Sequence, residues 1–193
     1  YLIQLVFAVS GLRKYKKKLD YADYTRYVES DNIVPISVLV PAYNEEQTIC
    51  DTVKNLLSLD YPNYEVIVIN DGSKDETLKK LVEEFNLVTI NEPFKVSIPT
   101  EAVKNVYRSV KSSNLVVVDK ENGGKADAIN MGINASKYPY FTCMDADSIL
   151  QKDSLSKIAA PILENQDVVA VGSMIRISND CEFKDGELIK MRL

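Results

Sequence analysis

Residues 36–73, ISVLVPAYNEEQTICDTVKNLLSLDYPNYEVIVINDGS, contain the clearest secondary-structure pattern of the chain. This stretch opens with a short apolar run at 36–40, and a second apolar run follows at 64–69. Runs of this kind, without alternation, are typical of strands that are covered on both faces, as in parallel sheets. Between them, apolar residues recur at helical spacing and predict a helix over 45–59. The stretch therefore predicts one strand–helix–strand unit.

The same pattern continues along the chain. Further apolar runs predict strands at 115–118 and 140–144. Further helices are expected at 75–86, 124–136 and 153–164. Strands that alternate with helices predict an α/β fold, doubly wound around a mostly parallel central sheet.

Other local signals are more limited. The apolar stretch 168–177 predicts another strand, and Asp185-Gly186 predicts a hairpin turn after it. Ser73 with Glu76 forms a capping-box pattern for the helix that follows, and Asn44 with Gln47 resembles one. The interval 88–113 does not fit the strand–helix rhythm, and we interpret it as an insertion or a flap.

Composition excludes several kinds of site. The chain of 193 residues has no histidine, so a catalytic triad or a metal site built on histidine is excluded, and a metal would rely mainly on oxygen ligands. The three cysteines, Cys50, Cys143 and Cys181, are far apart and fit neither a zinc pattern nor a disulfide framework. Reduced thiols in a cytosolic setting are the simplest interpretation.

The N-terminal region combines an apolar stretch with a basic cluster. YLIQLVFAVSGL at 1–12 precedes RKYKKK at 13–18, and a signal peptide would have the opposite order. We interpret 1–18 as the end of a transmembrane helix with a basic segment on its cytoplasmic side, because basic residues favour that side. A buried or interfacial amphipathic helix is the alternative. Residues 19–34 are expected to be a linker, and the net charge of −5 argues against a broad nucleic-acid surface.

Polar side chains follow three of the predicted strands at the point where each strand ends. They occur in PAYNEE at 41–46, NDGSKDE at 70–76 and DAD at 145–147. Ligands of open parallel sheets bind outside the carboxyl ends of the strands. We therefore expect these groups to meet in a ligand cleft.

The two carboxylates of Asp145 and Asp147 could face one hard cation. Mg²⁺ or Mn²⁺ takes one or two carboxylates and completes its coordination with phosphate oxygens and water, which makes a nucleoside diphosphate a plausible partner. An acidic pair that starts a loop can equally be a helix cap or a solvated turn. The motif by itself therefore does not distinguish a cation site from a helix cap or a solvated turn.

Each of the other strand ends also has two interpretations. Asp71 could accept a hydrogen bond from a ring N–H of a base, or it could form an Asx-turn. Tyr43 could stack on a base, or it could be a half-buried tyrosine. KENGGKADAIN at 120–130 opens a helix with two glycines and Lys125, which suits a diphosphate, or it is a glycine turn with a solvated lysine.

Taken together and in this order, the four motifs resemble glycosyltransferase family 2, whose members have the GT-A fold. The residues that carry the resemblance are ISVLVPAYNEE, VIVINDGSKDET, KENGGKADAINMGI and FTCMDADS, within about residues 35–177. The nearest members are membrane-bound bacterial polysaccharide synthases, such as poly-N-acetylglucosamine, chitin, hyaluronan and cellulose synthases. The resemblance implies a metal-dependent, inverting transfer of a sugar from a UDP-sugar donor to a glycan acceptor at the cell membrane, on the cytoplasmic side.

The resemblance also implies roles for individual residues. Tyr43 would stack on uracil, and Asp71 would hydrogen-bond a nitrogen of that ring. Asp145 and Asp147 would hold the nucleotide and the metal, with Asp147 as the direct ligand. Lys125 would approach the diphosphate. Glu45 would border the ribose.

One departure from the family pattern concerns the catalytic base, which in the family is an acidic residue of a later motif. We expect the base beyond Leu193, so that 35–193 is the donor-binding half of a GT-A domain and transfers sugar negligibly by itself. The main alternative is a non-catalytic, membrane-anchored subunit that binds UDP. A sugar nucleotidyltransferase is disfavoured because PAYNEEQT has no glycine or basic residue, and a dinucleotide-dependent oxidoreductase because G-x-G-x-x-G is absent there.

Overall fold

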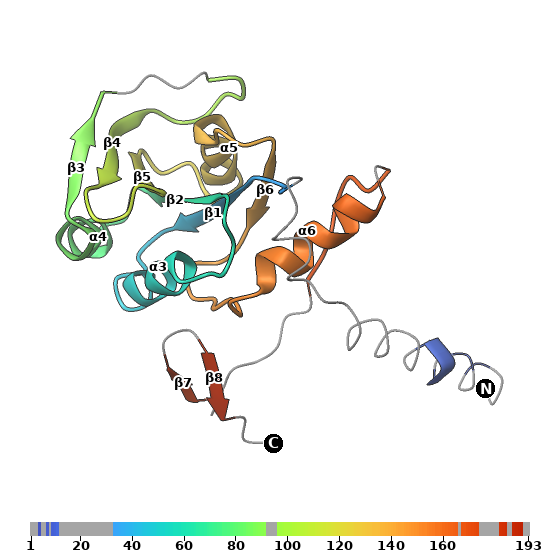
Figure 1. Cartoon of the computed structure of the whole chain (residues 1–193). Coiled ribbons are helices and arrows are strands. Elements are labelled where there is room, and N and C mark those ends of the chain that lie inside the picture. The colour runs from blue at the N-terminus through green and yellow to red at the C-terminus, as the bar shows by residue number, and fades with distance from the viewer. Residues whose placement is uncertain are drawn as a thin grey trace.

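The structure, a computed structural model, describes residues 4, 7, 9–11, 33–91, 96–165, 167–173, 182–184 and 187–190. Its elements in chain order are β1 (Ile36–Ala42), α3 (Ile49–Leu57), β2 (Tyr64–Asp71), α4 (Thr77–Phe85), β3 (Leu87–Ile90), β4 (Val103–Ser109), β5 (Leu115–Lys120), α5 (Lys125–Ala135), β6 (Tyr140–Cys143), α6 (Ser154–Glu164), β7 (Glu182–Lys184) and β8 (Glu187–Lys190) (Figure 1). The four predicted strands at 36–40, 64–69, 115–118 and 140–144 are confirmed. The four predicted helices are confirmed too, and the largest difference is that α3 begins at Ile49 rather than at residue 45.

Six strands form one sheet in the order β3-β4-β5-β2-β1-β6. The strands β5, β2, β1 and β6 are parallel to their neighbours, whereas β4 is antiparallel to both β5 and β3. The sheet is therefore mixed and mostly parallel, as the sequence predicts. β1 and β2 lie at its centre, and every residue of β2 is buried.

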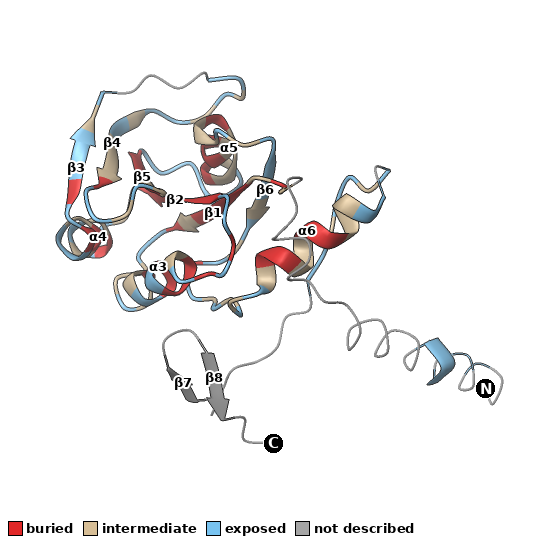
Figure 2. Cartoon of the chain, viewed as in Figure 1, coloured by how far each residue is buried: buried red, intermediate tan, exposed pale blue. Residues whose placement is uncertain are grey.

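Side chains that alternate along the central strands reach two separate cores. Val38 and Val40 of β1 pack with apolar residues of α3, α4 and α6 on one face of the sheet. Leu39, between them, packs with Ala128 and Met131 of α5 on the other face. Figure 2 shows buried residues concentrated in the central strands and on the helix sides that face them. Helices cover both faces, which explains why β1 and β2 are apolar at nearly every position.

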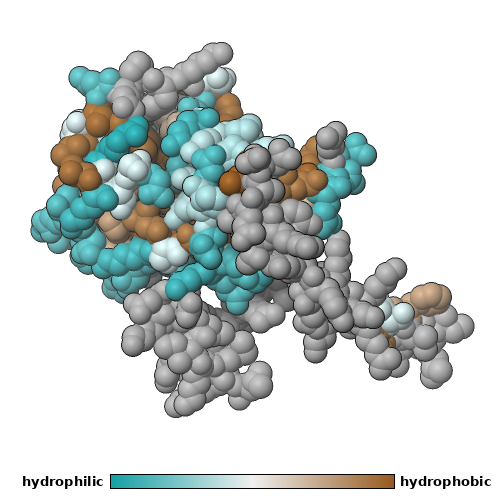
Figure 3. Space-filling view, in the orientation of Figure 1, coloured by the Kyte–Doolittle hydropathy of each residue, from teal (hydrophilic) through white to brown (hydrophobic). Residues whose placement is uncertain are grey.

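The interval 88–113 departs from the strand–helix rhythm as expected, but its described strands are not a flap. β3 and β4 extend the sheet as antiparallel strands beside β5. β4 is at most half-buried along most of its length, so its sequence lacks the continuous apolar run of the central strands. In the space-filling view, apolar side chains gather at the margin over β3, beside a mostly hydrophilic face (Figure 3).

Two further strand expectations need correction. The run at 140–144 does form a strand, but β6 is the outermost strand of the described sheet and is largely exposed, with Phe141 50% exposed. Residues 168–173 are not a strand, and Val169 is almost fully exposed. An apolar run becomes a strand only when a neighbour pairs with it, and none of the described residues pairs with 168–173. Residues 174–177 lie outside the described part.

The C-terminal hairpin expectation is confirmed for its strands. β7 and β8 pair antiparallel, with the predicted Asp185-Gly186 turn between them lying outside the described residues.

The described positions 4, 7 and 9–11 are helical, and the remainder of 1–18 and nearly all of 19–34 lie outside the description. Within the residues that the structure describes, no helix is both long enough and apolar enough to cross a bilayer.

Candidate nucleotide-binding site

The carboxyl ends of β5, β2, β1 and β6 lie at one edge of the sheet, because these strands are parallel to their neighbours. The chain runs from β1 to β2 on one side and later returns to place β6 on the other side of β1. The strand order therefore reverses between β1 and β6. Ligands of open α/β sheets bind at such reversals, and here Tyr43 follows β1 while Asp145 follows β6.

The loops that follow β1 and β2 are tied to each other by hydrogen bonds. The backbone N–H of Asn44 donates to Ser73 Oγ at 3.0 Å, and the Lys74 N–H donates to Asn44 Oδ1 at 2.8 Å. Two neighbouring N–H groups of the first loop donate across the gap to side-chain oxygens of the second: Glu45 to Thr77 Oγ1 and Glu46 to Asp75 Oδ2. We call the two loops, residues 43–48 and 72–77, the paired loops.

The paired loops correct both capping expectations. α4 begins at Thr77 and α3 at Ile49, and neither N-cap side chain accepts a capping bond from a backbone N–H of its helix. Ser73 and Asn44 instead bond to each other's loop. Ser, Asn and Asp side chains compete for any nearby backbone group, and the groups nearest to them here belong to the neighbouring loop.

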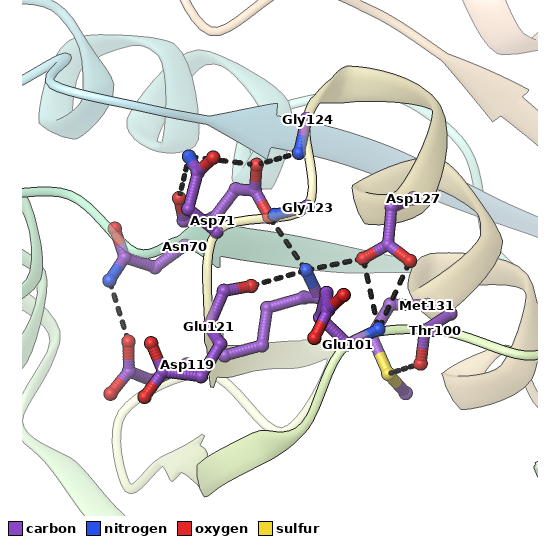
Figure 4. A network of polar contacts seen from close by, with 12 residues as sticks. Asn70, Asp71, Thr100, Glu101, Asp119, Glu121, Gly123, Gly124, Asp127 and Met131 are labelled. Atoms are coloured by element: carbon purple, nitrogen blue, oxygen red, sulfur yellow. Dashed lines mark hydrogen bonds and ion pairs between the residues drawn. The ribbon is translucent and has the colours of Figure 1, made fainter.

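Asp71, the last residue of β2, is buried and accepts four hydrogen bonds (Figure 4). Its Oδ1 accepts from Lys120 Nζ at 2.7 Å and from the Gly123 N–H at 3.0 Å. Its Oδ2 accepts from the Gly124 N–H at 2.7 Å and from Asn122 Nδ2 at 3.2 Å. A carboxylate has about four acceptor sites, so all of them are occupied.

The turn between β5 and α5 is held close to β2. Gly72 and Gly124 have positive φ angles of 68° and 87°, which glycine adopts without strain. A Cβ on Gly72 would also approach Asn122 N within 2.8 Å. The two glycines therefore allow the turn to approach Asp71 closely enough for its N–H groups to bond.

Asp145, Asp147 and Lys125 are arranged differently, because all three are exposed. Lys125 is the first residue of α5, and its Nζ lies 2.5 Å from Asp145 Oδ1. This hydrogen bond, together with the charges of Asp145 and Asp147, raises the pKa of Lys125. The three charged groups thus lie near one another in a solvent-accessible position.

All six candidate residues line one cavity of about 520 Å³. Its lining comprises Pro41, Ala42, Tyr43, Glu45, Asp71, Asn122, Gly124, Lys125, Ala128, Asp145, Ala146 and Asp147. The expectation that these groups meet in one cleft at the sheet edge agrees with this geometry. Tyr43 is 45% exposed, so one face of its ring is accessible to a ligand.

Sequence reasoning missed three residues of this region. Asn122 lines the cavity and bonds to Asp71, while Lys120 and Asp127 lie behind Asp71. Lys120 and Asp127 stand in the quoted motif KENGGKADAIN, but a lysine at a strand end is normally solvated. Asp127 could have been identified as an acidic residue in the first turn of the predicted helix, where a negative charge is stabilising.

No group of three or more acidic or cysteine side chains suited to a metal ion is found among the described residues. The cavity instead offers the two exposed carboxylates of Asp145 and Asp147. Such a pair fits Mg²⁺ or Mn²⁺ only when other oxygen ligands, such as phosphates and water, complete the shell. Of the cysteines in the described part, Cys50 and Cys143 are free thiols.

An α/β domain with a mostly parallel sheet and an acidic cleft at the carboxyl ends of its strands defines the class: GT-A-like glycosyltransferases. The model of glycosyl transferase family 2 matches residues 37–189. The chain therefore belongs to glycosyltransferase family 2.

Two relatives illustrate the similarity in sequence. The chain is 33% identical over 152 residues to a poly-beta-1,6-N-acetyl-D-glucosamine synthase of Staphylococcus epidermidis, covering 78% of this chain and 31% of that protein. It is 34% identical over 128 residues to the enzyme of the same name from Staphylococcus aureus strain COL, covering 66% and 25%. The chain thus spans less than a third of the length of these curated relatives.

Solved structures support the same fold. Residues 1–349 of S. aureus TarS in complex with UDP-GlcNAc are 26% identical, with a TM-score of 0.51, and the match covers 69% of this chain and 32% of that one. A mannosyltransferase of Pyrobaculum calidifontis, in complex with GDP-Man and Mn²⁺, has a TM-score of 0.54 over 93% of this chain and 49% of that one. At 21% identity, the second likeness concerns the fold alone.

Proposed function

We propose that residues 35–193 form the donor-binding part of a metal-dependent, inverting glycosyltransferase that uses a UDP-sugar and builds a glycan. The observation that carries the proposal is the meeting of Tyr43, Asp71, Lys125, Asp145 and Asp147 in one cavity. Support also comes from the synthases to which the chain is similar and from TarS, which binds UDP-GlcNAc. A UDP-sugar combines a planar base, a diphosphate and a sugar. The cavity has side chains suited to the base and others suited to the diphosphate.

The base would lie between Tyr43 and Asp71. The ring of Tyr43 offers an accessible face for stacking, which every base can use. The ionised carboxylate of Asp71 can only accept hydrogen bonds, so it selects a base with an N–H on its edge, such as uracil. Since four donors already occupy Asp71, we expect the longest bond, from Asn122, to yield to the base.

The diphosphate would lie between Lys125 and the acidic pair. Asp147 and Asp145 would hold Mg²⁺ or Mn²⁺, and the ion, when bound, neutralises charge on the departing UDP. Lys125 now pairs with Asp145, and it would exchange this partner for a phosphate oxygen. Glu45, whose Oε2 accepts from Thr48 Oγ1 at 3.1 Å, would border the ribose.

The proposal extends to the location of the protein. The apolar stretch 1–12 with the basic cluster 13–18 would anchor the chain in the cell membrane, and residues 19–34 would link the anchor to the transferase domain on the cytoplasmic side. The glycan acceptor would approach the cavity from solvent. In the reaction, a base would take the proton of the acceptor hydroxyl as that oxygen displaces UDP from the anomeric carbon.

Calorimetry tests the donor site directly. UDP is titrated into the chain with Mn²⁺ and with a chelator, and CDP serves as the matched control because cytosine has an acceptor where uracil has an N–H. We expect UDP to bind about tenfold more tightly than CDP and only weakly without the cation. Equal affinities for UDP and CDP would remove the role of Asp71, and no binding of UDP would overturn the proposal.

A further inference from the structure

Lys120 is the largest side chain in the described part with essentially no exposure to solvent. Lysine is almost never fully buried unless it is paired, because an unpaired ammonium pays a large desolvation cost. Lys120 ends β5 on the same sheet edge as the cavity, but it does not line the cavity. Its position therefore needs an explanation other than contact with a ligand.

The ammonium of Lys120 has three partners, one for each of its N–H donors. It lies 2.7 Å from Asp71 Oδ1 at the end of β2 and 2.5 Å from Asp127 Oδ1 in the first turn of α5. It also donates to the carbonyl oxygen of Glu121 at 2.6 Å. Figure 4 shows these contacts converging on one nitrogen between the strand ends and α5. One buried cation therefore joins β2, β5 and α5.

The two carboxylates that face Lys120 each hold a backbone segment. Asp71 accepts from the Gly123 and Gly124 N–H groups, immediately before Lys125. Asp127 accepts from the Glu101 N–H at 3.1 Å and packs so closely on Gly123 that a Cβ there would overlap it. Without a cation between them, the negative charges of the buried Asp71 and the partly buried Asp127 would face each other across this turn.

Burial and hydrogen bonding have opposite effects on the pKa of Lys120, and together they favour the charged ammonium. Burial acts to lower the pKa of Lys120, but the hydrogen bonds that its ammonium donates to Asp127 and Asp71 outweigh burial, so the pKa is raised. The charged side chains that contact the ammonium are those of Asp71 and Asp127. The other charged residues of β2, β4, β5 and α5 are Glu65, Lys104, Arg108, Asp119 and Lys125. Lys104 pairs with Glu121 at 3.4 Å and Lys125 with Asp145, so Lys120 is the cation that Asp71 and Asp127 share.

We propose that Lys120 is a positioning residue of the donor site: it fixes the Asp71 carboxylate as an acceptor and, through Asp71 and Asp127, fixes the Gly123–Gly124 turn that directs Lys125 into the cavity. The inference rests on the proposed function for its consequence, which is UDP affinity. The geometric part, the hold on the turn, is independent of any ligand.

The first test follows the turn itself by NMR. The amide resonances of Gly123 and Gly124 are recorded between about pH 5 and about pH 8 in the parent chain, Lys120→Met and Lys120→Arg. Lys54→Met is the matched control, because Lys54 pairs with Glu84 at the surface. We expect both amides to titrate in Lys120→Met, since two neighbouring carboxylates without a cation share a proton.

The parent chain, Lys54→Met and Lys120→Arg should show no such titration, because each retains a buried cation. Amides in Lys120→Met that stay at the parental positions throughout this range would overturn the proposal. UDP affinity is measured on the same samples, and we expect Lys120→Met to bind about tenfold more weakly near pH 8. The deficit relative to the parent should grow as the pH falls, because a protonated Asp71 is no longer a free acceptor.

A double variant guards against a failure to fold. Lys120→Met with Asp127→Asn removes the cation and one of the two negative charges that face it, so it avoids two unpaired carboxylates. We expect it to melt closer to the parent than Lys120→Met does, yet to bind UDP more weakly than the parent. Parental affinity, within about twofold, would show that Lys120 only balances charge and would overturn the positioning role. If the parent itself does not bind UDP, the proposed function fails, and the glycine amides alone decide the inference.

Discussion

Two lysine–aspartate pairs lie at the same edge of the sheet, and they differ mainly in their exposure to water. Lys120 and Asp71 are 2.7 Å apart, with side chains 0% and 4% exposed. Lys125 and Asp145 are 2.5 Å apart, with side chains 64% and 57% exposed. Asp71, Lys125 and Asp145 line the same cavity, with Lys120 directly behind it.

The comparison shows that similar chemistry serves two purposes. The buried pair has fixed partners on three elements, so it shapes the site, and the bond from Asn122 to Asp71 is the one contact that we expect it to exchange. The exposed pair is bonded to little else and is screened by water, so its separation costs little. A site of this kind needs both: a fixed part for the base and an exchangeable part for a charged ligand.

The largest expected effect is on stability and concerns the buried pair. Lys120→Met leaves the buried Asp71 and the partly buried Asp127 without their cation, and breaking a buried pair costs about 3–5 kcal/mol. Urea unfolding at neutral pH measures the free energy of unfolding. The matched variant is Lys125→Met, which removes the same side chain from the exposed pair. If the two variants lose equal stability, the distinction between the pairs is wrong.

The second prediction concerns the cation. Asp147→Asn removes one charge from the exposed acidic pair, and we expect Mn²⁺ to enhance UDP affinity about tenfold less than in the parent. Calorimetry with and without Mn²⁺ gives this enhancement. Asp167→Asn, at an exposed position outside the cavity lining, is the control and should behave as the parent does. An unchanged enhancement in Asp147→Asn would refute the assignment of this carboxylate to the metal.

The third prediction tests the aromatic face beside the buried pair. Tyr43→Ala should weaken UDP binding by about 1–2 kcal/mol, which is typical of one stacked base. Tyr43→Phe keeps the ring and should bind UDP almost as well as the parent. Both affinities come from the same calorimetric titration. A loss of similar size in both variants would mean that the hydroxyl, and not stacking, is responsible.

The smallest expected effect concerns the stability contribution of the exposed pair. Lys125→Met should change the free energy of unfolding by less than about 1 kcal/mol, because exposed ion pairs contribute little. Its UDP affinity should fall about threefold at low salt and less at high salt, where charges are screened. Calorimetry at two salt concentrations checks this. A loss that does not depend on salt would indicate that Lys125 acts through packing.

The sequence predicted the central sheet well because its signals are local. β1, β2 and β5 are covered on both faces, so each is a continuous apolar run. β4 escaped prediction because it is half-exposed and depends on β5 and β3 for pairing. β6 carries an apolar run but is exposed, since its burial depends on a neighbour and not on its own residues.

The residues of the site also fall into those that local sequence signals predicted and those that only the folded chain brings together. Strand ends and glycines marked Tyr43, Asp71 and Asp147, because parallel strands must bring such residues to one edge. Lys120 was not predicted, because its burial arises from two carboxylates on β2 and α5 that only the folded chain brings together. Ser73 was assigned to a helix cap, but its hydroxyl accepts from the loop after β1, which is distant in the sequence.

The paired loops have a consequence for the speed of ligand capture. Tyr43 directly precedes a segment that is joined by five hydrogen bonds to the segment after Asp71, so the backbone that carries the aromatic ring is held beside the end of β2 in the empty protein. A nucleobase entering between them would meet surfaces already in place, and little conformational entropy would be lost. Base docking should therefore need little rearrangement of these two loops, with the exchanges of partner confined to Asn122 and to the Lys125–Asp145 pair.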